Sequence, residues 1–175
     1  DERFYEHNGI DLQGIIRAGA VGVMNGFKFS EGASTLTQQL IKNNVYDFVN
    51  EETFFDKVER KLQEQYLALA FEKEMSKEQI LEAYMNTINL GQGCYGVQTA
   101  SARYFNKDAA DLTLSECAVI AAITQNPTRF DPVKNPDKNA ERRQKVLDNM
   151  LDQGYVDQAA YDEAVADPVY ERIVQ

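Results

Sequence analysis

Helix-start signals recur along this chain, and apolar residues at helical spacing follow them. Asp11 can accept the first backbone N–H groups of a helix, as Asp, Asn, Ser and Thr commonly do at such positions. Segments 76–79 and 113–116 each have a hydroxyl residue three positions before Gln or Glu, the pattern of a capping box. Apolar–polar alternation, which would indicate strands, occurs only in short pieces. The sequence therefore predicts a mainly α protein, with helices expected over residues 11–25, 54–73, 114–123 and 137–153 and from residue 76 onward.

Length and composition set looser limits on the protein. The 175 residues are 43% hydrophobic, which is enough for the core of one domain, and we predict a single domain over residues 1–175. The net charge of −10 argues against a nucleic-acid partner, although a few clustered cations could still hold an anionic substrate. With His7 as the one histidine, we expect no metal site built from protein side chains. No apolar run reaches the ~20 residues of a membrane-spanning helix.

Segment 32–43, GASTLTQQLIKN, is predicted to be a tight turn that opens into a short helix, which Ser34 or Thr35 can cap. Ser34, Gln38 and Lys42 are four residues apart, so on a helix they share one face, with leucines on the other side. A polar face that ends in a cation could cradle a hydroxyl-rich, anionic ligand. It could also be the solvated face of a capped surface helix, and periodicity alone favours that second interpretation.

Five segments carry a resemblance to a known family, in the order that the family has them. Segment 32–43 resembles the second signature motif of glycosyltransferase family 51, the peptidoglycan glycosyltransferase domain of class A penicillin-binding proteins and monofunctional glycosyltransferases. The other four motifs are DERFYEHNGID (1–11), RKLQEQYLALAFE (60–72), ILEAYMNTINLGQGCYGVQTASARYF (80–105), and LSECAVIAAITQNPTRFDP with AERRQKVLDNM (114–132 and 140–150). So many long motifs in register would not arise together by chance.

The resemblance implies a lysozyme-like, mainly α domain with two lobes flanking a substrate cleft. It implies an enzyme that polymerises lipid II into β-1,4 glycan strands, with inversion at the anomeric carbon and release of undecaprenyl diphosphate. The implied partners are lipid II, the growing lipid-linked glycan chain, the membrane surface, and cell-wall synthesis and division proteins. The implied location is the extracytoplasmic face of the bacterial plasma membrane, through an anchor outside this sequence. A divalent cation, Mg²⁺ or Mn²⁺, could assist at the diphosphate, although the sequence shows no dedicated site for one.

The resemblance also assigns roles to individual residues. Asp1 matches the Asp of the first motif, and the family's proposed general base, a Glu, would be the residue before it. That position is outside this sequence, which puts the activity of the 175-residue chain in question. Glu64 matches the second functional carboxylate, and Arg60 and Lys61 match the basic pair of the third motif. Taken without the resemblance, Arg60 and Glu64 would be an ordinary ion pair worth ~0.3–0.5 kcal/mol. The implied substrate-binding residues are Ser34, Thr35, Gln38, Gln39, Lys42, Arg60, Lys61, Gln125 and Arg142.

Within this set, Lys42, Arg60 and Arg142 are the candidates for stabilising the negative charge that builds up on the leaving diphosphate. Glu64 is expected to orient these cations or to engage the acceptor. We expect His7 to be hydrogen-bonded within the first motif, as a structural residue, because a histidine without a paired base is weak evidence of catalysis.

Two other functions remain open at this stage. A lysozyme-like or lytic-transglycosylase-like enzyme would share the implied fold and also use a Glu acid. The several cations argue against it, because such an enzyme has no diphosphate to hold. A non-catalytic module that binds glycan or lipid is the other alternative, and it would gain weight if the residue encoded before Asp1 were not an acid.

Overall fold

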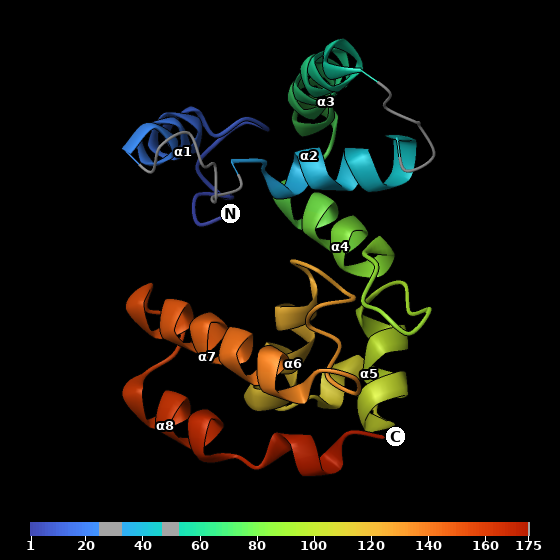
Figure 1. Ribbon diagram of the computed structural model, residues 1–175, viewed down its shortest axis with the longest axis vertical. Helices are drawn as coiled ribbons and strands as arrows, with labels where there is room; N and C mark the ends of the chain where they lie inside the picture. Colours follow the sequence, from blue (N-terminus) through green and yellow to red (C-terminus); the bar gives the residue numbers. More distant parts are fainter. Residues whose placement is uncertain (25–32, 47–52, 175) are drawn as a thin grey trace. The chain divides into compact units, whose positions relative to one another are not determined.

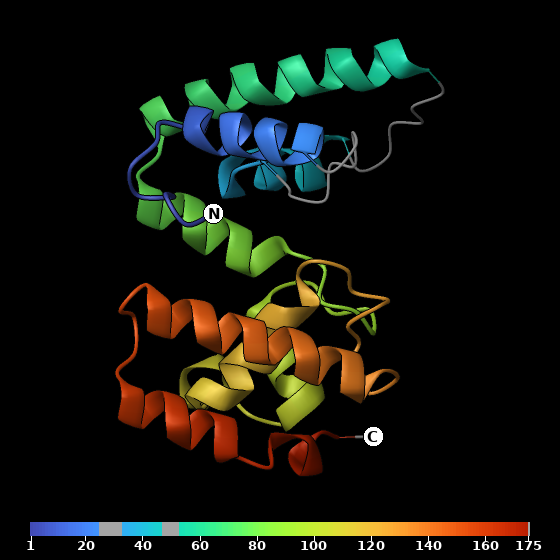
Figure 2. The same ribbon diagram turned by 60° about the vertical axis from the view of Figure 1, so that its left-hand side comes forward.

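The computed structural model describes residues 1–24, 33–46 and 53–174, and these residues are mainly helical (Figures 1 and 2). They include no β-strand, and Asn89 and Tyr95 form an isolated antiparallel bridge. The chain divides into two compact units, Asp1–Thr87 and Ile88–Gln175. The α-helices are α1 (Leu12–Met24), α2 (Leu36–Ile41), α3 (Phe54–Glu74), α4 (Lys77–Thr87), α5 (Val97–Phe105), α6 (Leu114–Ile123), α7 (Pro136–Asp152) and α8 (Gln158–Ala166).

In the first unit, side-chain caps start the helices, and the one at Asp11 was predicted. Asp11 accepts the backbone N–H of Gly14 at 2.9 Å at the start of α1, and it also forms an ion pair with Arg3 at 2.6 Å. That hydrogen bond from Arg3, more than any other contact, holds the pKa of Asp11 below its usual value. Thr53 caps α3 in a box with Asp56. Helix α2 packs against both α3 and α4, and it lies between them in both views (Figures 1 and 2).

The packed face of α3 differs from what its sequence suggests. Glu64, Ala68 and Glu72 are spaced four residues apart, so they share one face, and the Glu64 and Ala68 side chains are fully buried. Four bulky apolar residues are on another side and are 40–73% exposed: Val58, Leu62, Tyr66 and Leu69. Helical spacing identifies a face, but it does not say what covers that face. In this unit the face that carries two carboxylates is the covered one.

The second unit is held together by a larger apolar core and by one buried carboxylate. Helix α6 packs against α5, α7 and α8, and fully buried side chains fill the space between these elements: Tyr104, Val119, Ile123 and Leu147. Glu116, at the third position of α6, is also fully buried. Its carboxylate accepts hydrogen bonds from Lys107 Nζ at 2.8 and 2.9 Å and from Arg172 Nε at 3.1 Å.

The glycine-rich segment 89–96 of the second unit forms a turn, closed by the bridge between Asn89 and Tyr95. Gly91 and Gly93 have φ values of 77° and 76°, which only glycine adopts without strain. The carbonyl of Leu90 accepts a hydrogen bond from the buried hydroxyl of Tyr104 at 2.7 Å.

The mainly α fold predicted from the sequence is confirmed, and α6 spans the predicted residues. The single domain over residues 1–175 and the substrate cleft between two lobes stay predictions. No helix in the described ranges is long and apolar enough to cross a membrane.

Candidate functional site

The start of α2 is fixed by a buried capping box. Thr35 Oγ1 accepts the backbone N–H of Gln38 at 3.2 Å, and Gln38 Oε1 accepts the backbone N–H of Thr35 at 2.9 Å. Thr35 Oγ1 also donates to the carbonyl of Gly9 at 2.8 Å. Thr35 and Gln38 are 1% and 3% exposed. The expected polar face through Gln38 is therefore not formed, because the Gln38 side chain turns back onto the helix start.

Ser34, immediately before this box, connects α2 to α3. Its hydroxyl accepts a hydrogen bond from Lys61 Nζ at 2.7 Å, and Lys61 Nζ also donates to Glu64 Oε2 at 2.9 Å. Glu64 pairs on its other oxygen with Arg60. Glu64 is buried, whereas the Lys61 side chain is 44% exposed. Because the spacing along α3 is three and four residues, all three charged groups reach the same face of this helix.

This cluster has an excess of positive charge. One carboxylate faces two cations, and the exposed Lys61 can present its ammonium to a ligand while Glu64 holds it in place. Lys42, the residue directly after α2, begins the π-helical segment Lys42–Tyr46 and is exposed, with no ion pair to any residue in the described ranges. Gln39 is half-buried, donates to the Ser34 carbonyl at 3.3 Å and accepts from the Tyr84 hydroxyl at 3.2 Å.

Asp1 lies at the same end of α2. Its Oδ2 accepts the backbone N–H of Leu36 at 2.7 Å, and its two carboxylate oxygens lie 3.1 and 3.2 Å from Nε2 of His7. The side chains of His7 and Asp1 are only 7% and 2% exposed. The structure therefore brings the candidate residues Asp1 and Ser34 to one end of one short helix.

Sequence reasoning missed the polar residues behind His7. Lys77 Nζ lies 3.4 Å from His7 Nδ1 and forms an ion pair with Glu72 at 2.6 Å. Glu72 in turn accepts a hydrogen bond from the Thr37 hydroxyl at 2.5 Å. Glu72 falls within the third motif and Thr37 within the second, but nothing in their spacing indicates that they meet, because they are 35 residues apart.

The remaining candidates, Gln125 and Arg142, belong to the second unit. Gln125 is exposed just after α6. Arg142 is in the second turn of α7, since this helix begins at Pro136. The dipole of α7 has little effect on Arg142 there, because the dipole acts mainly within the first turn. Its Nε atom is nevertheless buried without a hydrogen-bond partner in the described part of the chain.

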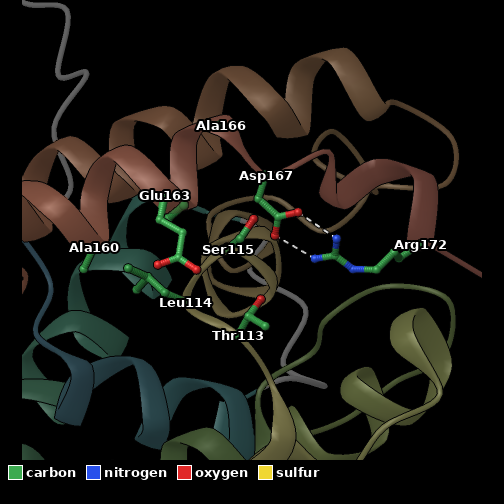
Figure 3. Close-up of a pocket in the computed structure, with 9 residues that line it drawn as sticks. Thr113, Leu114, Ser115, Ala160, Glu163, Ala166, Asp167 and Arg172 are labelled. Carbon is green, nitrogen blue, oxygen red and sulfur yellow. Dashed lines mark hydrogen bonds and ion pairs between the residues drawn. The ribbon is translucent and has the colours of Figure 1, made fainter.

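Hollows in the described part of the surface include one on each unit. One, of about 540 Å³, is in the first unit and is bordered by His7, Asp11 and Leu69. The other, of about 600 Å³, is in the second unit, between the start of α6 and the end of α8 (Figure 3). Arg172 lines this second hollow, but it donates to both oxygens of Asp167 at 2.7 Å and also pairs with Glu116. Its charge is already neutralised, so we place the candidate site at the start of α2 instead.

No group of three or more His, Cys, Asp or Glu side chains in the described ranges is arranged to hold a metal ion. The donors at the start of α2 are ammonium, guanidinium and hydroxyl groups, which suit an anionic, hydroxyl-bearing ligand.

The chain belongs to the transglycosylase family, whose model matches residues 1–151. It is 46% identical over 175 residues to penicillin-binding protein 1A of Clostridium botulinum, covering 95% of this chain and 20% of that protein. It is 46% identical over 156 residues to penicillin-binding protein 1F of Bacillus subtilis, covering 89% of this chain and 21% of that protein. The family predicted from the sequence is confirmed, and with it the class of enzyme.

Among solved structures, the chain is similar to the crystal structure of penicillin-binding protein 1A from Haemophilus influenzae. The TM-score is 0.52 and the sequence identity 41%, over 54% of this chain and 14% of that one. The chain spans about a fifth of the length of the curated relatives named above.

Proposed function

We propose that this domain polymerises lipid II into β-1,4 glycan strands, with inversion at the anomeric carbon and release of undecaprenyl diphosphate. The observation that carries the proposal is the contact of Lys61 with both Ser34 and Glu64, which joins the second and third family motifs in one cationic site. A reaction that expels a diphosphate needs fixed positive charge where the leaving group becomes negative.

The residues divide into roles on this proposal. Lys42, Arg60 and Lys61 bind the diphosphate, and the hydroxyl of Ser34 binds a phosphate or sugar oxygen. Glu64 orients the two cations beside it, because both of its oxygens are engaged by them. Thr35 and Gln38 support the site by holding the start of α2, without touching the substrate. Gln125 and Arg142 of the second unit stay candidate substrate-binding residues on this proposal.

The general base is proposed to be the residue encoded immediately before Asp1. A carboxylate there would take the proton of the acceptor hydroxyl as that oxygen attacks the anomeric carbon. The substrate is lipid-linked, so the protein is proposed to work at the extracytoplasmic membrane surface, through an anchor outside this sequence and alongside other cell-wall synthesis and division proteins.

The experiment is lipid II polymerisation by the 175-residue chain and by a form extended through its natural upstream residues, with glycan strands resolved on gels. We expect strands from the extended form alone. Lys42→Ala in that form should reduce the rate at least ~100-fold while its melting temperature changes by less than about 2 °C, because Lys42 is exposed. Lys73→Ala, which removes another exposed cation of the first unit, is the matched control.

The other outcomes separate the alternatives. Strands from the unextended chain would overturn the placement of the base, and a fully active Lys42→Ala would overturn the role of that cation. Cleavage of preformed glycan without any strand synthesis would identify a lytic enzyme. Binding of lipid II by folded but inactive protein in both forms would identify a binding module.

A further inference from the structure

His7 contacts Asp1 and a backbone N–H of its own segment through its two different ring nitrogens. Gly9 donates its backbone N–H to Nδ1 of His7 at 3.1 Å, and Nε2 faces the Asp1 carboxylate at 3.1 and 3.2 Å. A backbone N–H can only donate, so Nδ1 must present its lone pair. The ring proton is then on Nε2 and is donated to Asp1.

Asp1 is thereby held by two donors from different parts of the first unit. One is the imidazole of His7, and the other is the backbone N–H of Leu36, two residues after Ser34. The side chains of His7 and Asp1 are only 7% and 2% exposed, so water has little access to compete for these hydrogen bonds. A carboxylate fixed in this way cannot rotate freely. It ties Asp1, in the first motif, to the first residue of α2, next to the segment that carries Ser34.

The segment that carries His7 is itself fixed. The carbonyl of Gly9 accepts the hydroxyl of Thr35 at 2.8 Å, and a Cβ atom at Gly9 would lie 2.6 Å from the carbonyl oxygen of Ala68 in α3. The ammonium of Lys77, which lies next to the His7 ring, is 4.6 Å from the centre of the Phe4 ring. Contacts with the start of α2, with α3 and with α4 therefore fix the position of His7, and His7 in turn fixes the Asp1 carboxylate.

We propose that His7 is a positioning residue, which orients the Asp1 carboxylate through Nε2–H and so sets the place of the preceding residue relative to the start of α2. The proposal rests on the proposed function, in which that preceding residue is the base. An error of about 1 Å in such a placement can reduce a rate ~100-fold without altering substrate binding. His7 does not itself touch the substrate.

The charged groups facing His7 make this arrangement sensitive to pH. They are Asp1 and Asp11 of the first segment, Glu72 of α3 and Lys77 of α4. Burial first, and then the charge of Lys77, hold the pKa of His7 below its ordinary value of 6.5, while Glu72 and Asp11 oppose the shift. Protonation would place a second N–H on Nδ1, against the N–H of Gly9. The hydrogen bond from Gly9 to Nδ1 is therefore complete above pH 6.5, and it is lost as the pH falls through the lower pKa that His7 has in the folded state.

Two substitutions separate the two nitrogens. The side-chain nitrogen of Gln can replace Nε2 as the donor to Asp1, whereas Asn is too short to do so but can still accept from Gly9 through its side-chain oxygen. In polymerisation assays of the extended protein, we expect His7→Gln to keep kcat within about 5-fold and to lose the acid limb that His7 causes. We expect His7→Asn to lose at least ~100-fold in kcat with KM changed less than about 3-fold. Glu6→Gln, an exposed neighbour, is the control.

Equal activity of His7→Asn and His7→Gln would overturn the proposal, as would an equal loss in both with equally lowered melting temperatures. A second measurement does not depend on activity. Because His7 is the only histidine of the 175-residue chain, its ring ¹⁵N signals are unambiguous, and they should show the Nε2–H form at pH 7.5. Finding the Nδ1–H form would overturn the proposal even if the protein makes no glycan, whereas inactivity with the Nε2–H form counts against the proposed function alone.

Discussion

Buried carboxylates organise both units, and they differ in how far away their partners are in the sequence. Glu64 is held by Arg60 and Lys61, four and three residues before it, so helical spacing alone indicates the cluster. Glu116 is held by Lys107 and Arg172, which are 9 and 56 residues away. Sequence spacing predicts the first arrangement and cannot predict the second, because nothing local specifies which distant cation returns to a buried acid.

We expect Glu116→Gln to destabilise the second unit by about 3–5 kcal/mol, since it leaves Lys107 and Arg172 beside a neutral buried group. Glutamine can still accept from the Thr113 backbone and so keeps the helix cap. Urea unfolding measures the change, and Glu171→Gln, an exposed residue of the same region, should shift stability by less than about 0.5 kcal/mol. A Glu116→Gln protein as stable as the parent would show that the charge contributes nothing.

Glu116 also makes the stability of the second unit depend on pH. Burial alone would raise the pKa of Glu116, but the hydrogen bonds from Lys107, Thr113 and Arg172 outweigh it, and the net pKa is lowered. This contribution is present above the unfolded value of 4.5 and is lost as the pH falls through the folded value. The Glu116→Gln protein should therefore lose less stability than the parent on acidification below pH 4.5.

At the scale of the element, helix starts were the most predictable feature and also the source of one error. The box of Thr113 with Glu116 forms as predicted, and Ser76 with Gln79 makes both reciprocal hydrogen bonds at 2.9 and 3.3 Å. The same chemistry at α2 uses Gln38, which the sequence had suggested as a ligand contact. The box pattern and a polar binding face coincide at these positions, and only burial distinguishes them.

Thr35→Ala should destabilise the first unit by about 2–4 kcal/mol, because it removes a cap and leaves the Gly9 carbonyl and the Gln38 N–H unpaired in a buried place. Thr53→Ala removes the equivalent cap of α3 at an exposed position and should cost about 1 kcal/mol. Denaturant midpoints of the two proteins test this difference. Equal losses would mean that burial and the bond to Gly9 add nothing to the α2 cap.

The apolar pattern of α3 illustrates a different limit. Its period is helical, and the helix forms, but the apolar side is exposed and the side with Glu64, Ala68 and Glu72 is packed. Small and charged residues on the packed side suit the close approach of Gly9 and the polar contacts of α2. A rule that assigns the apolar face to the interior therefore predicts the helix correctly and its orientation incorrectly.

At the scale of the whole molecule, the division into Asp1–Thr87 and Ile88–Gln175 separates two kinds of interior. The first has a polar centre around His7 and Glu64, built from motifs that lie far apart in the chain. The second has fully buried apolar side chains on α5, α6 and α7 and on the segments before α5 and after α8: Leu90, Tyr104, Val119, Ile123, Leu147 and Val169.

We expect residues 88–175 alone to fold, because this unit contains both its own apolar core and the partners of Glu116. Circular dichroism should show helix, and urea should unfold the fragment in one cooperative transition. Leu147→Ala tests whether that transition reports the native core, because this substitution should lower the free energy of unfolding by about 2–5 kcal/mol. A broad, gradual loss of signal, unaffected by Leu147→Ala, would contradict the prediction.

Gly9 does no chemistry, yet it is a point of close approach between the first segment and α3, where a Cβ atom would lie 2.6 Å from a backbone oxygen and φ is +96°. A survey of every substitution along the chain should therefore record position 9 as intolerant, beside the charged positions that we propose bind substrate. Substitution patterns alone would not separate the two cases. Folding yield would, since any replacement of Gly9 should reduce the amount of native protein, whereas replacing Lys42 should reduce only its turnover.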